Sequence, residues 1–150
     1  MSRMPGRRPR AAPGMTGPDF PRLTPENHRV TSPPTPDYNC IAWAAGDTER
    51  WWEPGAFWPI PAAGYGADAL AAAFAALGFE PCPDGSPEPG WEKVALYAAG
   101  PFYTHAARQL PSGAWTSKLG RLDDIEHDTP EAVAGGVYGE VAGFMRRVKR

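Results

Sequence analysis

The sequence predicts an α+β fold in which N-terminal helices pack on a small antiparallel β-meander. In the first half of the chain, apolar residues recur every three to four positions over 39–52 and 67–77, as on one face of a helix. From Trp91 onward the apolar period changes to two, which is typical of half-buried strands. With 150 residues, 42% of them hydrophobic, the chain fits one domain with a single core. We therefore expect one α+β domain over 21–150.

The N-terminal segment 1–20 is rich in Arg, Pro and Gly and has no apolar periodicity, so we expect a disordered basic tail. Met15 is an alternative start site within it. Prolines punctuate residues 21–37 and predict an extended arm that lies on the domain.

A helix is expected to begin directly after this arm, at about Asn39, and to run to about Trp52. Asp37 or Asn39 can cap it, and either cap places Cys40 in the first turn. Unpaired N–H groups and the positive end of the helix dipole favour a thiolate there, and a thiol of lowered pKa is a nucleophile. The alternative is that Cys40 is a small buried hydrophobe, a common role for free cysteine.

A loop and a second helix follow. Residues 53–65 combine Pro and Gly with aromatic residues, so we expect a rigid loop that covers the cysteine helix or lines a cleft. The spacing predicts a helix over 67–77, ended by Gly78. Residues 81–90 predict a turn-rich loop that contains Cys82.

Strand periodicity dominates the second half. It predicts three strands joined by turns, over 92–98, 103–110 and 114–119. An acidic polar segment follows at 121–128. Thr129-Pro130-Glu131 is typical of a helix start, with Thr as the cap and Pro in the first position, so we expect a closing helix to about Arg147.

Charge and composition exclude several classes of function. Eight of the 15 basic residues lie in the first ten and last five positions, which leaves 7 basic against 17 acidic residues in the body. A nucleic-acid-binding face needs basic residues on the folded surface, so we expect no nucleic-acid partner. No apolar segment is long enough to span a membrane or to act as a secretory signal. Two cysteines form neither a disulfide framework nor a CxxC zinc site, which favours a cytoplasmic protein with reduced thiols.

The chain order Cys40, His105, then Asp123, Asp124 or His127 supplies the residue types of a thiol hydrolase. A thiolate attacks a carbonyl when an imidazole takes its proton, and a third polar group orients the imidazole. We expect Cys40 as nucleophile, His105 as base, and Asp124 or else His127 as the orienting group. Histidines in strands or acidic segments are also common core or surface residues. The same four residues have no recognised metal-ligand spacing, so we expect no metal and no other cofactor.

Four further side chains are assigned to oxyanion stabilisation or substrate contact: Tyr38, Asn39, Trp43 and Ser117. The backbone N–H of Cys40 would be another oxyanion donor. Across the hairpin, Ser117 or Lys118 would neighbour His105, depending on the strand register. Trp43 would line the cleft or else belong to the core.

Several blocks resemble a family of uncharacterised bacterial proteins with a domain of unknown function: YNCIAWA at 38–44, EKVALY at 92–97, THAARQ at 104–109, WTSKLG at 115–120 and DIEH at 124–127. This resemblance covers about 22–147 and implies no established activity. More distantly, a Cys-bearing helix followed by a His-bearing strand is similar to papain-like cysteine hydrolases, including bacterial cell-wall amidohydrolases and amidases. That similarity implies a papain-like core, with Cys40 as nucleophile, His105 as base and Asp124 as orienting group. The chain departs from that pattern because it lacks a glutamine just upstream of Cys40 and a secretion signal.

Two functional hypotheses follow. The first is a small cytoplasmic cysteine hydrolase that cleaves an amide or acyl bond in a peptide or small amide substrate. The second is a non-catalytic module on the same scaffold that binds a partner protein or peptide. A comparison of Cys40 with Cys82 in alkylation across pH discriminates them, because only the enzyme needs an activated Cys40.

Overall fold

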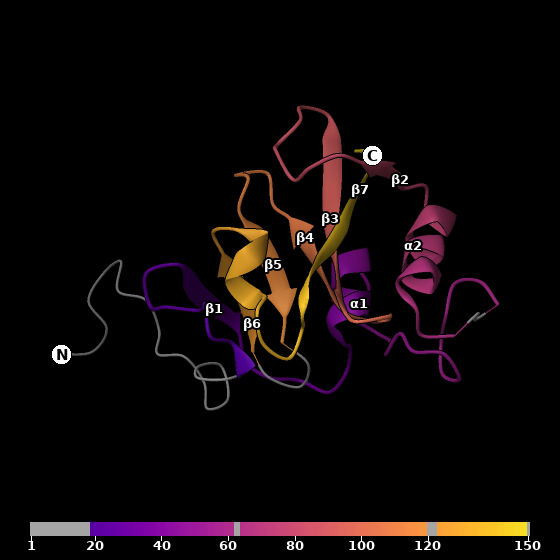
Figure 1. Cartoon of the computed structure of the whole chain (residues 1–150), viewed down its shortest axis with the longest axis horizontal. Coiled ribbons are helices and arrows are strands. Elements are labelled where there is room, and N and C mark those ends of the chain that lie inside the picture. Colours follow the sequence, from indigo (N-terminus) through magenta and orange to yellow (C-terminus); the bar gives the residue numbers. More distant parts are fainter. Residues whose placement is uncertain (1–18, 62–63, 120–122, 150) are drawn as a thin grey trace.

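The computed structural model describes residues 19–61, 64–119 and 123–149. Their centre is one seven-stranded antiparallel sheet in the order β1-β6-β5-β4-β3-β7-β2 (Figure 1). The strands are β1 (His28–Ser32), β2 (Glu80–Cys82), β3 (Trp91–Ala99), β4 (Phe102–Gln109), β5 (Trp115–Lys118), β6 (Asp124–His127) and β7 (Glu140–Val148).

The described residues contain two short α-helices, α1 (Cys40–Ala45) and α2 (Ala67–Ala76), and a 3₁₀ helix, η2 (Pro130–Val133). The fold is therefore mainly β. The predicted α+β class, with helices packed on a small meander and a papain-like core, is wrong. Four strand segments lie where the sequence predicted an arm, loops or a helix, and they extend the meander to seven strands.

The largest error is the closing helix predicted from Thr129 to about Arg147. The helix start is real but produces only η2, because Gly135 and Gly139 adopt positive φ angles of 88° and 65° that end helical geometry. The chain then enters β7, which pairs with β3 over nearly its whole length and with β2 on its other side. Pairing in the middle of the sheet thus outweighs a local helix signal.

The helix that carries the cysteine is also shorter than predicted. It ends at Ala45 rather than Trp52, because Gly46 takes a left-handed conformation with φ of 86° and its N–H bonds back to the last turn. By contrast, α2, β3, β4 and β5 lie within about one residue of their predicted ends.

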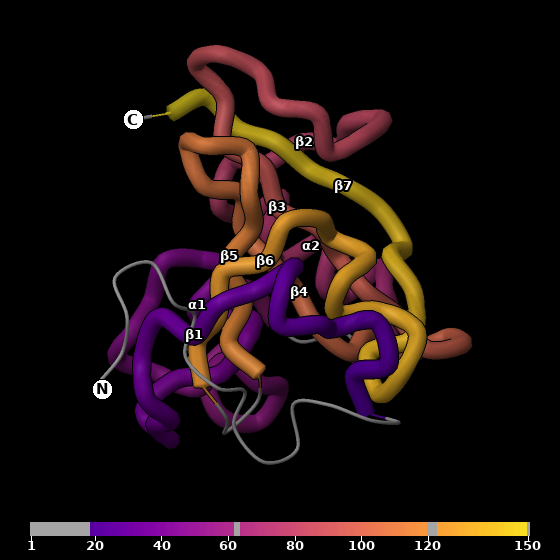
Figure 2. Tube along the Cα trace, turned by 90° about the vertical axis from the view of Figure 1, so that its left-hand side faces the viewer, coloured from indigo at the N-terminus to yellow at the C-terminus, as the bar shows by residue number. Residues whose placement is uncertain are grey.

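Strand β1 comes from the predicted arm and pairs with β6, which comes from the predicted acidic segment. Figure 2 shows these two segments side by side, although they are far apart in the sequence. The pairing brings His28 opposite His127 and places the predicted site residue His127 inside the sheet.

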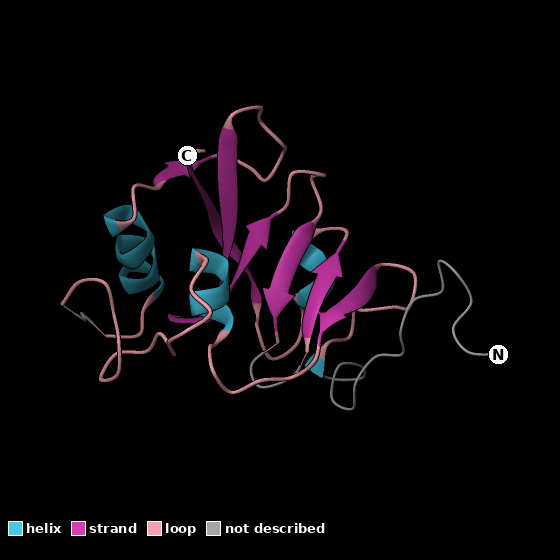
Figure 3. Cartoon of the chain, turned by 180° about the vertical axis from the view of Figure 1, so that it is seen from behind, coloured by secondary structure: helices cyan, strands magenta, loops and turns pink. Residues whose placement is uncertain are grey.

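Each face of the sheet has its own hydrophobic core. Helices α1 and α2 cover one face, and η2 lies on the other (Figure 3). The helix-side core includes Ile41, Leu70 and Phe74, whereas the η2-side core includes Tyr97 and Ile125. Residues 1–18, including Met15 and most of the predicted tail, lie outside the described residues. Phe20, at the predicted end of that tail, is only 4% exposed and belongs to the η2-side core.

Candidate functional site

Cys40 is the first residue of α1, and Asn39 caps this helix. The Asn39 side-chain oxygen accepts hydrogen bonds from the N–H groups of Ala42 and Trp52, both at 3.1 Å, and its amide donates to the Trp52 carbonyl at 2.7 Å. Because both ends of this amide already bind the backbone, Asn39 acts as a cap and a brace for the segment after α1. Its predicted role as an oxyanion donor would have to use the second hydrogen of this amide or break the bond to Trp52.

Cys40 is 9% exposed and packs in the helix-side core. Its Sγ lies 4.0 Å from the carbonyl oxygen of Thr104 on β4. Burial raises the pKa of the Cys40 thiol to about 11, although the N–H groups of Ala106 and Ile41 and the Lys118 ammonium act in the opposite direction. The lowered thiol pKa expected from the helix start is therefore absent, because desolvation outweighs the field of a six-residue helix. At neutral pH the resting group is a thiol.

His105 lies on β4 at a register shift of the β3–β4 pair and is fully buried. Its ring stacks on Tyr138 with centroids 4.0 Å apart and meets the Tyr97 ring edge-on. Its Nε2 lies 2.9 Å from Oγ of Ser117, and this same Oγ lies 2.7 Å from Nε2 of His127. The structure thus joins three of the predicted site residues in one buried chain across β4, β5 and β6.

The partners in this chain determine where its protons lie. Nδ1 of His127 lies 2.7 Å from the Thr129 carbonyl, which can only accept, so Nδ1 carries a hydrogen. Burial lowers the pKa of His127 to about 4, so the ring is neutral and its Nε2 accepts the Ser117 hydroxyl hydrogen. Oγ of Ser117 then accepts from Nε2–H of His105.

His105 is consequently left with a lone pair on Nδ1. Burial keeps the pKa of His105 well below its ordinary value, and protonation of His127 would lower it further, so this ring too is neutral. Nδ1 is buried and has no hydrogen-bond partner among the residues that the structure describes. A general base requires a ring nitrogen that is unprotonated and not already hydrogen-bonded, on a ring that is held in place through its other nitrogen.

Cys40 and His105 are neighbours through β4 but are not hydrogen-bonded to each other. Sγ of Cys40 contacts the carbonyl of Thr104, the residue that directly precedes His105. The His105 ring, however, packs against Tyr97 and Tyr138 of the η2-side core, whereas Cys40 belongs to the helix-side core. The two groups therefore approach the same strand from different cores.

Asp124 does not contact His105. It is fully buried at the start of β6, where its Oδ2 accepts a 2.7 Å hydrogen bond from the Tyr38 hydroxyl and its Oδ1 lies 3.8 Å from Nζ of Lys118. Tyr38 also stacks on Trp43, whose indole donates to Oγ1 of Thr116 at 3.0 Å. Ser117 occupies the position next to His105 that was predicted for Asp124.

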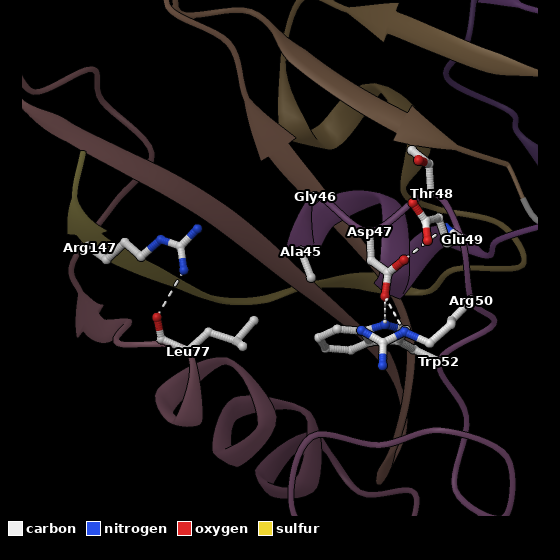
Figure 4. A pocket seen from close by; sticks show the side chains of 9 residues that line it. All are labelled: Ala45, Gly46, Asp47, Thr48, Glu49, Arg50, Trp52, Leu77 and Arg147. Atoms are coloured by element: carbon white, nitrogen blue, oxygen red, sulfur yellow. Dashed lines mark hydrogen bonds and ion pairs between the residues drawn. The ribbon is translucent and has the colours of Figure 1, made fainter. Parts of the chain in front are cut away.

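A cavity of about 630 Å³ lies away from Cys40, beside the last residues of α1 and the residue after α2 (Figure 4). Three of its four charged side chains, those of Asp47, Arg50 and Arg147, are already partnered. Asp47 accepts from the indole of Trp52 and from Arg50, and Arg147 bonds to the Leu77 carbonyl and to Glu92. The cavity contains none of the predicted site residues.

Sequence reasoning missed three contributors: Thr104 beside the thiol, Tyr138 beneath the imidazole, and Thr129 behind His127. Thr129 was assigned only as a helix cap, and Tyr138 lay within the wrongly predicted closing helix. Among the residues in 19–61, 64–119 and 123–149, no group of three or more His, Cys, Asp or Glu is placed to hold a metal. In the same described part, no helix has the length and apolar character needed to cross a membrane.

Comparison with protein-family models matches residues 29–146 to a domain of unknown function, DUF7689. The chain belongs to the DUF7689 family. This agrees with the domain-of-unknown-function family recognised from the sequence blocks, whereas nothing supports the papain-like relationship or the bacterial origin. No curated protein matches this DUF7689 domain. No solved structure matches it either.

Proposed function

We propose that this domain is a cysteine hydrolase that cleaves an amide or acyl bond, with Cys40 as nucleophile and His105 as general base. The observation that carries the proposal is the unpartnered lone pair on Nδ1 of His105. His105 directly follows Thr104, whose carbonyl oxygen contacts Sγ of Cys40. Ser117 takes the role that was predicted for Asp124, because its Oγ holds Nε2 of His105. His127 fixes Ser117 in turn.

The reaction begins from a neutral pair, since Cys40 is a thiol and His105 an uncharged imidazole. As Sγ attacks the substrate carbonyl carbon, its proton passes to Nδ1 of His105, and the backbone N–H of Cys40 donates to the developing oxyanion. His105 then gives the proton to the leaving amine or alcohol as the carbon–heteroatom bond breaks. Water hydrolyses the resulting thioester with the same base, which releases the acid and restores the thiol. Because Cys40 packs in the core on one face of the sheet and the His105 ring packs on the core of the other face, the step requires β4 to shift near its register irregularity so that Sγ and Nδ1 come within hydrogen-bond reach.

A second candidate is the non-catalytic binding module. Two observations favour it: Cys40 is 9% exposed with a raised pKa, and its hydrogen-bond contact is a backbone carbonyl rather than an imidazole. In that case Cys40 is a core residue and the histidine chain only holds three strands together.

Acylation by p-nitrophenyl acetate, followed by peptide mass spectrometry, separates the two. The hydrolase acetylates at Cys40, and His105→Gln slows this step by on the order of a hundredfold or more. Cys82→Ser is the matched control and leaves the rate unchanged, because Cys82 lies on β2 away from the histidines. Equal acetylation of the two cysteines, or a rate that ignores His105, would favour the binding module.

We also propose that the protein works in the cytoplasm. Both cysteines, Cys40 and Cys82, are free thiols, as expected of a protein that works in the reducing cytoplasm.

A further inference from the structure

The cavity of Figure 4 lies beside a row of charged side chains on the helix-side face of the sheet. Arg147 of β7 lines this cavity and is paired with Glu92 of β3. Arg108 of β4 is paired with Val94, two residues further along β3. Residues two apart on a strand point to the same face, and Val94 belongs to the helix-side core. Arg108, Glu92 and Arg147 are therefore neighbours on that face, across three adjacent strands.

The Arg108 guanidinium lies against the wall of the cavity. Its Nη1 is 3.9 Å from the position that a Cβ on Gly46 would occupy, and Gly46 lines the cavity. It is also close enough to Glu92 to interact electrostatically, and Glu92 accepts a 2.7 Å hydrogen bond from the cavity residue Arg147. The ring of Trp43, whose centroid is 5.2 Å from Cζ of Arg108, supports the guanidinium through a cation–π contact.

Arg108 has no anionic partner. Among residues 19–61, 64–119 and 123–149 it forms no hydrogen bond and no ion pair, and its Nε is buried. The residues outside these ranges include no Asp or Glu. Burial lowers the pKa of Arg108, and Glu92, which acts in the opposite direction, is already bound by Arg147. Since buried N–H groups are nearly always satisfied, the half-buried guanidinium indicates a missing acceptor of negative charge.

Two further arginines line the cavity with N–H groups to spare. Arg50 donates only through Nε, and Arg147 only through Nε and Nη1. A guanidinium carries five N–H donors, so both Nη atoms of Arg50 and Nη2 of Arg147 are unused within the described part of the chain. Ala45 and Leu77 add apolar surface to the same cavity (Figure 4).

We infer that this cavity is a binding site for a small organic carboxylate, whose carboxylate group pairs with Arg108. The planar fork of a guanidinium matches a carboxylate, and a volume of about 630 Å³ is in the range of small-molecule pockets. A singly charged ligand is favoured over a phosphate, because Asp47 and Glu49 also line the cavity and would repel a second negative charge. The inference does not depend on the proposed hydrolase, none of whose residues lines this cavity.

Titration of the full chain with small carboxylates, followed by proton–nitrogen NMR, tests the site. The probes are benzoate and hexanoate, with benzamide as the uncharged analogue and phenyl phosphate as the doubly charged one. We expect saturable shifts of the Gly46 backbone N–H and the Arg108 Nε–H with at least one carboxylate, at a Kd of about 1 mM or lower. Benzamide and phenyl phosphate should bind about tenfold or more weakly than that carboxylate.

Two arginine variants give a matched comparison. Arg108→Gln removes the charge and should weaken carboxylate binding by about tenfold or more. Arg29→Gln removes an exposed arginine that pairs with Glu126 at the β1 edge of the sheet, and it should leave the affinity unchanged. The comparison of carboxylate with benzamide uses the wild-type protein and needs no variant to fold.

Each contrary result refutes the site. No saturable shift with either carboxylate, or equal affinity for benzamide, means that the cavity does not select a carboxylate. Tighter binding of phenyl phosphate refutes the assignment of a single charge. An affinity that is unchanged in Arg108→Gln, or that Arg29→Gln reduces equally, refutes the role of Arg108. Shifts that centre on Cys40 and Ala106 place the carboxylate at the proposed hydrolase site and not in this cavity.

Discussion

At the scale of single residues, the buried chain of His105, Ser117 and His127 has both a structural and a chemical consequence. Each of its polar atoms except Nδ1 of His105 is satisfied, so a single change in the chain leaves buried groups without partners. The same bonds fix the tautomers on which the proposed base depends. Its members can therefore be tested through stability as well as through reactivity.

Removal of the Ser117 hydroxyl should destabilise the fold. Ser117→Ala leaves the Nε2 atoms of both histidines buried and unpaired, and at about 1–3 kcal/mol for each such group we expect a loss of about 2–6 kcal/mol. Chemical denaturation measures it. Ser112→Ala, at an exposed turn where the hydroxyl accepts one backbone hydrogen bond, is the control and should cost no more than about 1 kcal/mol. A Ser117→Ala cost as small as that of the control would contradict the buried chain.

His127 should make stability depend on pH. Burial lowers its pKa from 6.5 to about 4, so between these values the unfolded chain binds a proton that the folded protein does not. The free energy of unfolding should therefore be unaffected by protonation of His127 above pH 6.5. It should fall by about 3 kcal/mol in total as the pH falls from 6.5 toward 4, because the unfolded chain gains the proton first. The free energy of unfolding of wild type and of His127→Gln, measured at pH 7.5 and 4.5, isolates it from the carboxyl groups. A difference between the two proteins that does not change with pH would disprove the assignment.

At the scale of elements, the sequence predicted the helices and strands whose formation depends mainly on local residue patterns. The stripe of Leu70 and Phe74 and the break at Gly78 specify α2 with little help from the rest of the chain, and the period of two specifies β3 and β4. Sheet pairing decided the other elements. Strand β6 looked like a solvated acidic loop because Asp124 and His127 are polar, and they are buried only because β1 and β5 flank them.

In the candidate site, too, local properties could be predicted, whereas properties set by the tertiary structure could not. The sequence placed Cys40 at a helix start and His105 in a strand, both of which are local properties. The partner of His105 depends on strand register, which was left open between Ser117 and Lys118. The thiol pKa depends on burial, a property of the whole core, and this is why burial raises it although the helix start predicted a lowered one.

Two glycines near the start of β7 should respond in opposite ways to Ala. A Cβ at Gly139 would overlap the Ala98 carbonyl oxygen, and its φ is 65°, so Gly139→Ala should cost at least about 3 kcal/mol. Gly143 has open space around it and no positive φ, so Gly143→Ala should be neutral or stabilise the strand by up to about 1 kcal/mol. Thermal unfolding of both variants tests this. Equal effects would mean that β7 does not enter the sheet through the tight approach to β3.

At the scale of the whole molecule, one sheet serves two cores, so neither core can form without the strands that support the other. Strand β3 contributes Val94 and Leu96 to the helix-side core and Ala95 and Tyr97 to the η2-side core. Successive residues of a strand point to opposite faces, so this sharing is inherent in the sheet. Partial unfolding of one face would expose the backbone and apolar surface of the other.

Unfolding of the described domain should therefore be a single cooperative transition. Leu70→Ala in the helix-side core and Ile125→Ala in the η2-side core each remove a fully buried side chain and should each cost about 2–5 kcal/mol. In each variant, tryptophan fluorescence and far-UV circular dichroism should give the same denaturation midpoint, and this midpoint should be lower than that of wild type. Separation of the two midpoints in either variant would mean that the cores unfold independently. Coincident midpoints would instead mean that both cores unfold in one transition, together with the histidine chain that crosses three strands of the shared sheet.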